Sequence, residues 1–239
     1  MGLFNRVACE IKLTAVGRDF LDEAGSVLSQ ADEARQMLYE FGGLERGRLS
    51  LAASQPIAGY WLPPVLVQFR QAHPGIACDL SIGNSEQAAA RVHEGAAELG
   101  FVEGPIDDPA LARWQVGKDR LALIGTNIPG NLDADALRKL DWVLREPGSG
   151  TRATLAAALR RRGIALDDLN LALTLPSNEA VLSVVAAGAG VTALSELVAE
   201  PLLTAGSVRS ASFDVAPRPF FALRHKDRYP PKRPMRCCT

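Results

Sequence analysis

Short apolar stretches alternate with helix-forming stretches along the chain from residue 48, and this alternation constrains the fold more than any other feature. Strand-like segments such as RLSLAAS (48–54), IACDLSIG (76–83) and DWVLRE (141–146) are each followed by a helical pattern. Strands that alternate with helices are typical of βαβ units with parallel strands. Two similar runs, 48–104 and 141–196, therefore predict an α/β fold with two sheet subdomains and a cleft between them.

Polar side chains gather where the predicted strands pass into helices. Four such junctions are Ser54-Gln55, Asn84-Ser85, Ser149-Gly150-Thr151 and Ser177-Asn178. The free N–H groups and the dipole of a helix N-terminus favour an anion there. One junction alone is explained by an ordinary N-cap. Four junctions at corresponding positions of two sheet units predict that these helix ends converge on one cleft, which would hold a small anion or carboxylate.

The segment REPGSGTRATL (145–155) resembles a phosphate-binding loop only superficially. A Walker loop needs a lysine that reaches the outer phosphates, whereas Arg152 follows Thr151 here. The three histidines, His73, His93 and His225, adjoin no glycine-serine turn and have no metal-ligand spacing. The pattern therefore favours binding without catalysis, and we expect no enzyme activity, metal or cofactor.

Composition and cysteine usage indicate a cytoplasmic protein. The formal net charge of −1 excludes a basic coat for nucleic acid. The four cysteines match no zinc pattern or disulfide framework and are expected to be reduced thiols; they are Cys9, Cys78, Cys237 and Cys238. No apolar run approaches the roughly 20 residues of a membrane span, and the N-terminus has no secretory pattern.

The N-terminal segment predicts a long helix that follows a piece too short to fold alone. Thr14 is a candidate N-cap, and the helix is expected over residues 15–42, before GGLERG (42–47) breaks the chain. Apolar residues recur in steps of three, four and seven, as in a coiled-coil seam. The alternative is an amphipathic helix lying on its own domain. The predicted dimerisation residues are Phe20, Leu21, Ala24, Val27, Leu28, Ala31 and Leu38.

Several motifs together resemble the LysR-type transcriptional regulators. LFNR…IKLTAVGRDFL is similar to their wing and linker helix, and GRLSLAAS…IAGYWLPPVLVQFRQAHPGIACDLSIGNSE to their first effector subdomain. ELGFVEGP, WVLREPGSGTR and SNEAVLSVVAAGAGVTALSE follow in the family order. The resemblance implies a fold like type 2 periplasmic binding proteins and a dimer, usually assembled further into a tetramer. It also implies control of transcription by a small inducer, often an anion or carboxylate.

The resemblance also implies the domain limits and the inducer-facing positions. The expected units are a wing remnant (1–14), a linker helix (15–42) and an effector domain (48–239). The effector domain is expected to divide into subdomain I (48–124 and 221–239) and subdomain II (125–220). The positions expected to bind the inducer are Ser54, Gln55, Asn84, Ser85, Val102, Glu103, Ser149, Thr151, Ser177 and Asn178.

Both ends of the chain depart from the family pattern. Members carry a winged helix-turn-helix before the linker helix, whereas this chain begins inside the wing, so a DNA partner is expected only if that domain is present. At the other end DRYPPKRPMRCCT (227–239) stands where a closing helix is expected, and its prolines forbid one. The open alternatives are a solute-binding protein of transport, a sensor or decoy dimer without DNA binding, and an enzyme on the same fold.

Overall fold

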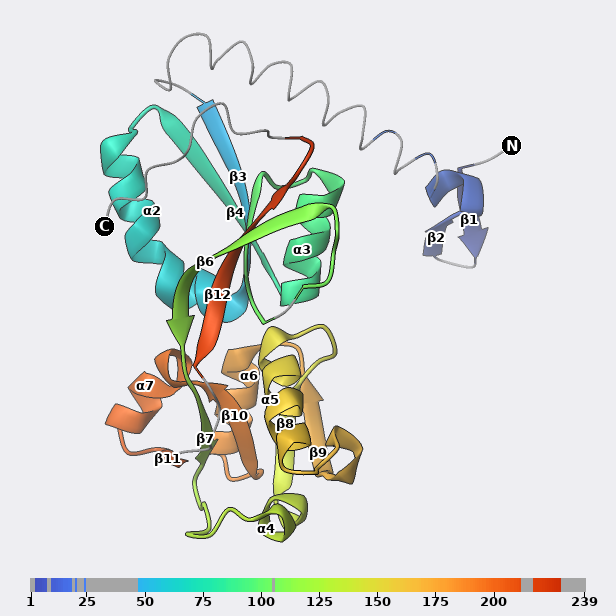
Figure 1. Cartoon of the computed structure of the whole chain (residues 1–239). Coiled ribbons are helices and arrows are strands. Elements are labelled where there is room, and N and C mark those ends of the chain that lie inside the picture. Colours follow the sequence, from blue (N-terminus) through green and yellow to red (C-terminus); the bar gives the residue numbers. More distant parts are fainter. Residues whose placement is uncertain are drawn as a thin grey trace.

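Two five-stranded sheets form the body of the protein. The computed structural model describes residues 3–7, 10–18, 20, 24, 47–104, 106–211 and 217–228. Figure 1 shows the two sheets end to end, with the chain passing from one to the other and later returning. The predicted α/β architecture with two subdomains is confirmed.

The first sheet has the strand order β4-β3-β5-β12-β6. Its strands are β3 (Gly47–Ser54), β4 (Ile76–Gly83), β5 (Leu99–Glu103), β6 (Leu111–Asp119) and β12 (Arg218–His225). β3 is parallel to β4 and β5, whereas β12 is antiparallel to β5 and β6. One apolar cluster joins this sheet to α3 (Ser85–Glu94). A second cluster joins it to a π-helical turn (Ile57–Trp61) and the start of α2 (Leu62–Ala72).

The second sheet has the strand order β11-β7-β10-β8-β9. Its strands are β7 (Leu121–Gly125), β8 (Asp141–Arg145), β9 (Asn170–Leu175), β10 (Val191–Ser195) and β11 (Arg209–Ala211). β8 is parallel to β9 and β10, and β7 is antiparallel to β10 and β11. The helices of this subdomain are α4 (Ala134–Lys139), α5 (Gly150–Arg161), a 3-10 turn (Leu166–Asp168), α6 (Asn178–Ala186) and α7 (Glu196–Thr204).

Burial on both faces explains the near-continuous apolar composition of the central strands. All five residues of β7 are buried, and successive ones alternate between two clusters. Leu121 and Leu123 pack with Trp142 and residues of α5, whereas Ala122 and Ile124 pack with residues of α6 and α7. A sheet covered by helices on both faces needs apolar side chains on both.

The chain changes sheets earlier than the sequence predicted. β6 ends at Asp119 in the first sheet and β7 begins at Leu121 in the second. The expected break after residue 124 therefore falls inside β7 and is wrong by about one strand. The return is also earlier, because β12 begins at Arg218 rather than after residue 220. β6, α4 and α7 were not predicted. β6 exposes much of its surface, and its residues do not alternate regularly between buried and exposed.

The N-terminal residues form a small hairpin and the start of a helix. β1 (Phe4–Val7) pairs antiparallel with β2 (Glu10–Leu13). The Thr14 hydroxyl accepts a hydrogen bond of 2.9 Å from the Gly17 N–H, so the predicted N-cap is confirmed. Of the predicted seam residues, Phe20 and Ala24 are helical, and Phe20 is exposed in the single chain. Leu21, Val27, Leu28, Ala31 and Leu38 lie outside the described residues, as do residues 229–239 and the expected coiled coil.

Candidate functional site

The carboxyl ends of the parallel strands from both sheets meet at the junction between the subdomains. Ser54 ends β3, Glu103 ends β5 and Arg145 ends β8. Hydrogen bonds between the two subdomains join the polar residues that follow these strands. In open α/β sheets ligands bind beyond the carboxyl ends of the strands. This junction is therefore the candidate functional site.

Three of the predicted junction residues are helix N-caps. The Asn84 side chain accepts from the Gln87 N–H at 2.9 Å, and the Gln87 side chain accepts in return from the Asn84 N–H, which completes a capping box. Ser149 caps α5, and Ser177 caps α6 through a 3.0 Å hydrogen bond from the Ala180 N–H. The N-cap explanation therefore holds at these positions and stabilises the helix ends that face the junction.

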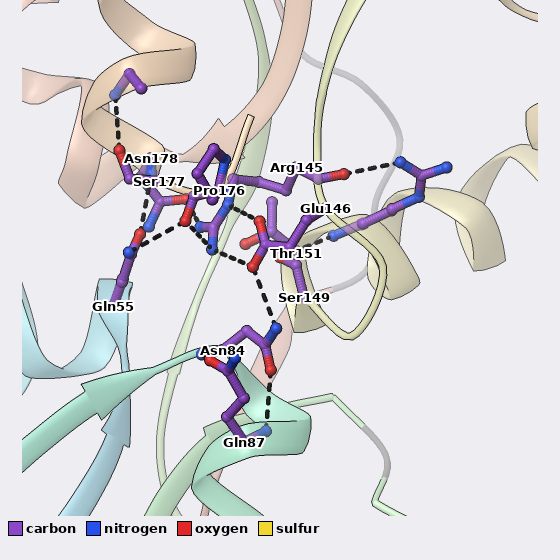
Figure 2. Close-up of polar contacts among 12 residues, drawn as sticks. Gln55, Asn84, Gln87, Arg145, Glu146, Ser149, Thr151, Pro176, Ser177 and Asn178 are labelled. Atoms are coloured by element: carbon purple, nitrogen blue, oxygen red, sulfur yellow. Dashed lines mark hydrogen bonds and ion pairs between the residues drawn. The ribbon is translucent and has the colours of Figure 1, made fainter. Parts of the chain in front are cut away.

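Gln55 and Asn84 reach from the first subdomain into the second (Figure 2). The Gln55 amide donates to the Pro176 carbonyl at 3.3 Å and accepts from the Asn178 N–H at 3.0 Å. The Asn84 amide donates to Glu146 Oε1 at 3.2 Å. These predicted residues therefore link the two subdomains directly.

Arg145 organises the second subdomain's side of the junction. It is buried and donates to the Glu146 carboxylate through Nε at 2.8 Å and Nη2 at 3.0 Å. It also donates to the Asn178 side-chain oxygen. Figure 2 shows that these contacts run on through Glu146 to Asn84. Sequence reasoning missed Arg145 and Glu146, although the charged pair at the end of an apolar strand was the available signal.

Glu146 is held in its ionised form by this arrangement. Burial alone would raise the pKa of Glu146, but the hydrogen bonds and charge of Arg145, together with the Asn84 amide, lower it below its ordinary value. The carboxylate is therefore a hydrogen-bond acceptor for both subdomains near neutral pH.

A second network centres on Arg218, at the start of the returning strand β12. Its guanidinium binds both carboxylate oxygens of Asp119, with Nε at 2.8 Å and Nη2 at 2.6 Å. Nη1 donates to the Thr151 hydroxyl at 2.9 Å and lies 3.5 Å from Glu103 Oε1. Burial opposes the charge of Arg218, but Asp119 and Glu103 raise its pKa. Arg218 thus ties the two crossing strands to the first turn of α5, a role that sequence reasoning missed.

Of the remaining predicted residues, Ser54 and Ser85 contact Glu103, whereas Val102 lies in the apolar core. The Ser54 hydroxyl donates to the Glu103 carboxylate, and the Ser85 hydroxyl donates to the Glu103 carbonyl at 3.1 Å. Val102 is fully buried in the apolar cluster of the first subdomain, so its side chain takes no part in the polar junction. A cavity of about 230 Å³ opens beside the start of α5, with Glu86, Glu103 and Arg152 in its wall.

Two buried polar groups at the junction have no hydrogen-bond partner within the described residues. They are the side-chain nitrogen of Asn178 and the hydroxyl of Ser195. Ser195 ends β10 opposite Leu121, the first residue after the crossing, and its hydroxyl does not cap α7. Leaving a buried polar group unpaired costs about 1–3 kcal/mol, so each such group needs an explanation. Sequence reasoning missed Ser195.

His93 and His225 lie apart from the junction. His93 Nδ1 is 2.7 Å from Asp108, and the His93 and His225 rings have centroids 6.0 Å apart. His225 ends β12, whose first residue is Arg218. At about 3.3 Å per residue, that places it roughly 20 Å from the Arg218 end of the strand. Among the described residues no cluster of histidine, cysteine and acidic side chains could hold a metal ion. Nor does any helix there have the length and apolar character needed to cross a membrane.

Comparison with known proteins supports the same fold. Residues 42–236 match the family model of the LysR substrate binding domain. The regulatory domain of CcmR from Synechocystis PCC6803, in a structure with 2-PG, superposes with a TM-score of 0.68 and 25% identity over 76% of this chain and 89% of that one. The arrangement is thus a type 2 periplasmic-binding-protein-like domain, in which two α/β subdomains enclose the candidate site.

Curated relatives include an uncharacterised HTH-type transcriptional regulator, YeiE of Escherichia coli K12, with 28% identity over 95% of this chain and 77% of that protein. They also include a phosphonates import ATP-binding protein, PhnC of Anaeromyxobacter dehalogenans, with 34% identity over 77% of this chain. The chain spans only 38% of the length of that PhnC protein. The chain belongs to the LysR family of transcriptional regulators, as its family match shows.

Gly150→Ala should push the subdomains apart. A Cβ atom at Gly150 would lie 2.6 Å from Ser85 Oγ and closer still to the Glu103 carbonyl oxygen, both in the other subdomain. We expect the free energy of unfolding to fall by about 1–3 kcal/mol and the radius of gyration from small-angle scattering to rise. Gly59→Ala is the matched control, because a Cβ there meets nothing within 4 Å. Equal effects of the two substitutions would contradict a tight junction at Gly150.

Glu146→Gln should remove a pH-dependent contribution to stability. Because the folded-state pKa of Glu146 lies below its ordinary value of 4.5, its carboxylate stabilises the folded protein above that pH. This contribution is lost as the pH falls through the lowered folded-state pKa. Urea unfolding from pH 7 to pH 3 should therefore show wild type and variant converging at the acid end. The exposed substitution Glu94→Gln corrects for the change in net charge, and a constant difference at all pH values would refute this role.

Proposed function

We propose that this chain senses a small anionic effector bound between its two subdomains and thereby controls transcription. The proposal rests on two buried groups that have no hydrogen-bond partner within the described residues, Asn178 Nδ2 and Ser195 Oγ, at the carboxyl end of the second sheet. The Asn178 nitrogen is a hydrogen-bond donor, and the Ser195 hydroxyl can donate too. A ligand that carries acceptor oxygens would satisfy both.

One arginine and two helix N-termini near the junction support an anion with several oxygens. Arg152 lies in the wall of the cavity beside the start of α5, where its guanidinium donates to the Arg145 carbonyl at 2.8 Å. The N-termini of α5 and α6 add partial positive charge. The regulatory domain of CcmR forms a complex with 2-PG, which is consistent with a small ligand in this class of domain.

Closure of the subdomains would be the signal. The two subdomains already share hydrogen bonds through Gln55, Asn84 and Arg218. An effector shifts such an equilibrium only by its difference in affinity for the open and closed forms. We infer that the linker helix passes this difference to a homodimer or tetramer in the cytoplasm, and to DNA where a helix-turn-helix domain precedes this segment. The residues beyond Ala24 that would carry the seam lie outside the described part of the chain.

The family assignment favours a regulator over the two alternatives with other functions. The fold alone would suit a solute-binding protein of transport. However, the relatives include an HTH-type regulator whose similarity extends over 95% of this chain. Family members are regulators rather than enzymes, and the paired histidines stand far from the junction. A sensor dimer that lacks a DNA reader would use the same effector cleft.

Ser195→Ala should separate effector binding from stability. The hydroxyl has no partner within the described residues, so its removal should leave the free energy of unfolding unchanged or raise it. If the hydroxyl binds the effector, affinity should fall about tenfold, as for a hydrogen bond to a charged group. Calorimetry with sulfate, inorganic phosphate and 2-PG would measure this change. The exposed Ser207→Ala is the control, and an unchanged affinity in Ser195→Ala would exclude this hydroxyl from the site.

A further inference from the structure

The buried centre of the junction holds more negative than positive charge. Arg218 is the guanidinium shared by Glu103 and Asp119, and all three side chains are at most 2% exposed. Asp119 takes a two-point contact with Arg218, whereas Glu103 lies 3.5 Å from Nη1 alone. Two carboxylates therefore face one cation. A buried charge without full pairing destabilises the fold. Of the two carboxylates, Glu103 is the one that Arg218 holds more weakly.

The Glu103 carboxylate lies between Ser54 and Thr151, two of the hydroxyl residues expected to bind the effector. On one side it accepts the hydrogen bond of Ser54 at the end of β3. On the other side Arg218 joins it to the Thr151 hydroxyl in the first turn of α5. Its side chain also packs on that turn, because a Cβ atom at Gly150 would lie 2.7 Å from Glu103 Cγ. The chain's own carboxylate thus occupies donors that an anionic ligand would use.

We propose that Glu103 is an internal competitor of the effector: it fills the anion position in the ligand-free protein, and the effector binds by displacing it. This inference rests on the proposed function. Two carboxylates cannot share the position without strong repulsion in a site with so little water. A monocarboxylate would replace Glu103 with an equivalent group and would lose association entropy without compensation. The effector must therefore make contacts that Glu103 does not make, through oxygens that a simple carboxylate lacks.

Glu103→Gln tests the competition directly. The substitution keeps the shape of the side chain and removes its charge. Sulfate binding, measured by calorimetry at constant ionic strength in chloride, should become at least about tenfold tighter, because a like charge leaves the site. Acetate, which should bind the wild type too weakly to detect, should become measurable. Glu94→Gln removes the same charge from an exposed helix end and should match the wild type. Unchanged or weaker sulfate binding in Glu103→Gln would overturn the inference.

Glu103→Ala gives a second test, which does not require the wild type to bind anions with a measurable affinity. It deletes the carboxylate and leaves its volume empty beside Ser54 and Arg218. Formate or acetate should fill that space and raise the thermal midpoint of Glu103→Ala by more than that of the wild type or of Glu94→Ala. Equal shifts in all three proteins would show that no anion position opens when Glu103 is removed, and would overturn the inference.

Two further substitutions distinguish failure of this inference from failure of the proposed function. If Ser54→Ala and Thr151→Ala both leave sulfate affinity unchanged, in the wild type and in Glu103→Gln, anions bind elsewhere and the cleft assignment fails with the inference. If they weaken sulfate binding while Glu103→Gln leaves it unchanged, the cleft stands and only the competitor role of Glu103 is overturned.

Discussion

The need to pair buried polar groups where the two sheets meet governs the rest of this structure. Strand ends and helix N-termini present polar groups at the junction, and burial without partners would destabilise the fold. Arg218 meets this need on the crossing strands, where it binds Asp119 and Thr151. Arg145 meets it in the second subdomain through Glu146 and Asn178. Arg218 thus joins the subdomains directly, and Arg145 holds the Glu146 carboxylate that Asn84 contacts from the first subdomain.

The same pairing explains how such a junction could respond to a ligand. Hydrogen bonds between residues of the two subdomains hold it together. Asn178 and Ser195 remain unpaired within the described residues, and Glu103 shares a cation that Asp119 already binds at two points. A ligand that binds Asn178 and Ser195 and displaces Glu103 would favour a closed geometry that differs from the geometry of the ligand-free protein. The affinity difference between the two geometries sets the size of the response.

Local sequence signals predicted much of the fold but few of the contacts that matter at the site. The alternation of strands and helices predicted both sheets, and the caps at Asn84, Ser149 and Ser177 follow from residues adjacent in sequence. The pairing of Arg218 with Asp119 spans 99 residues and depends on where the chain crosses between sheets. That crossing was misplaced, because β7 is apolar enough to suit either sheet. Val102 was assigned to the site by resemblance, although its side chain points into the core.

We propose that an anion binds between Ser54 and Thr151 in the position that Glu103 fills. Crystals of the protein soaked in saturating selenate test it most directly, because selenium gives an anomalous signal that locates the anion. We expect an anomalous peak within hydrogen-bond distance of both hydroxyls, with the Glu103 side chain moved away from Ser54. A selenate ion bound elsewhere, with the hydrogen bond from Ser54 to Glu103 intact, would contradict it.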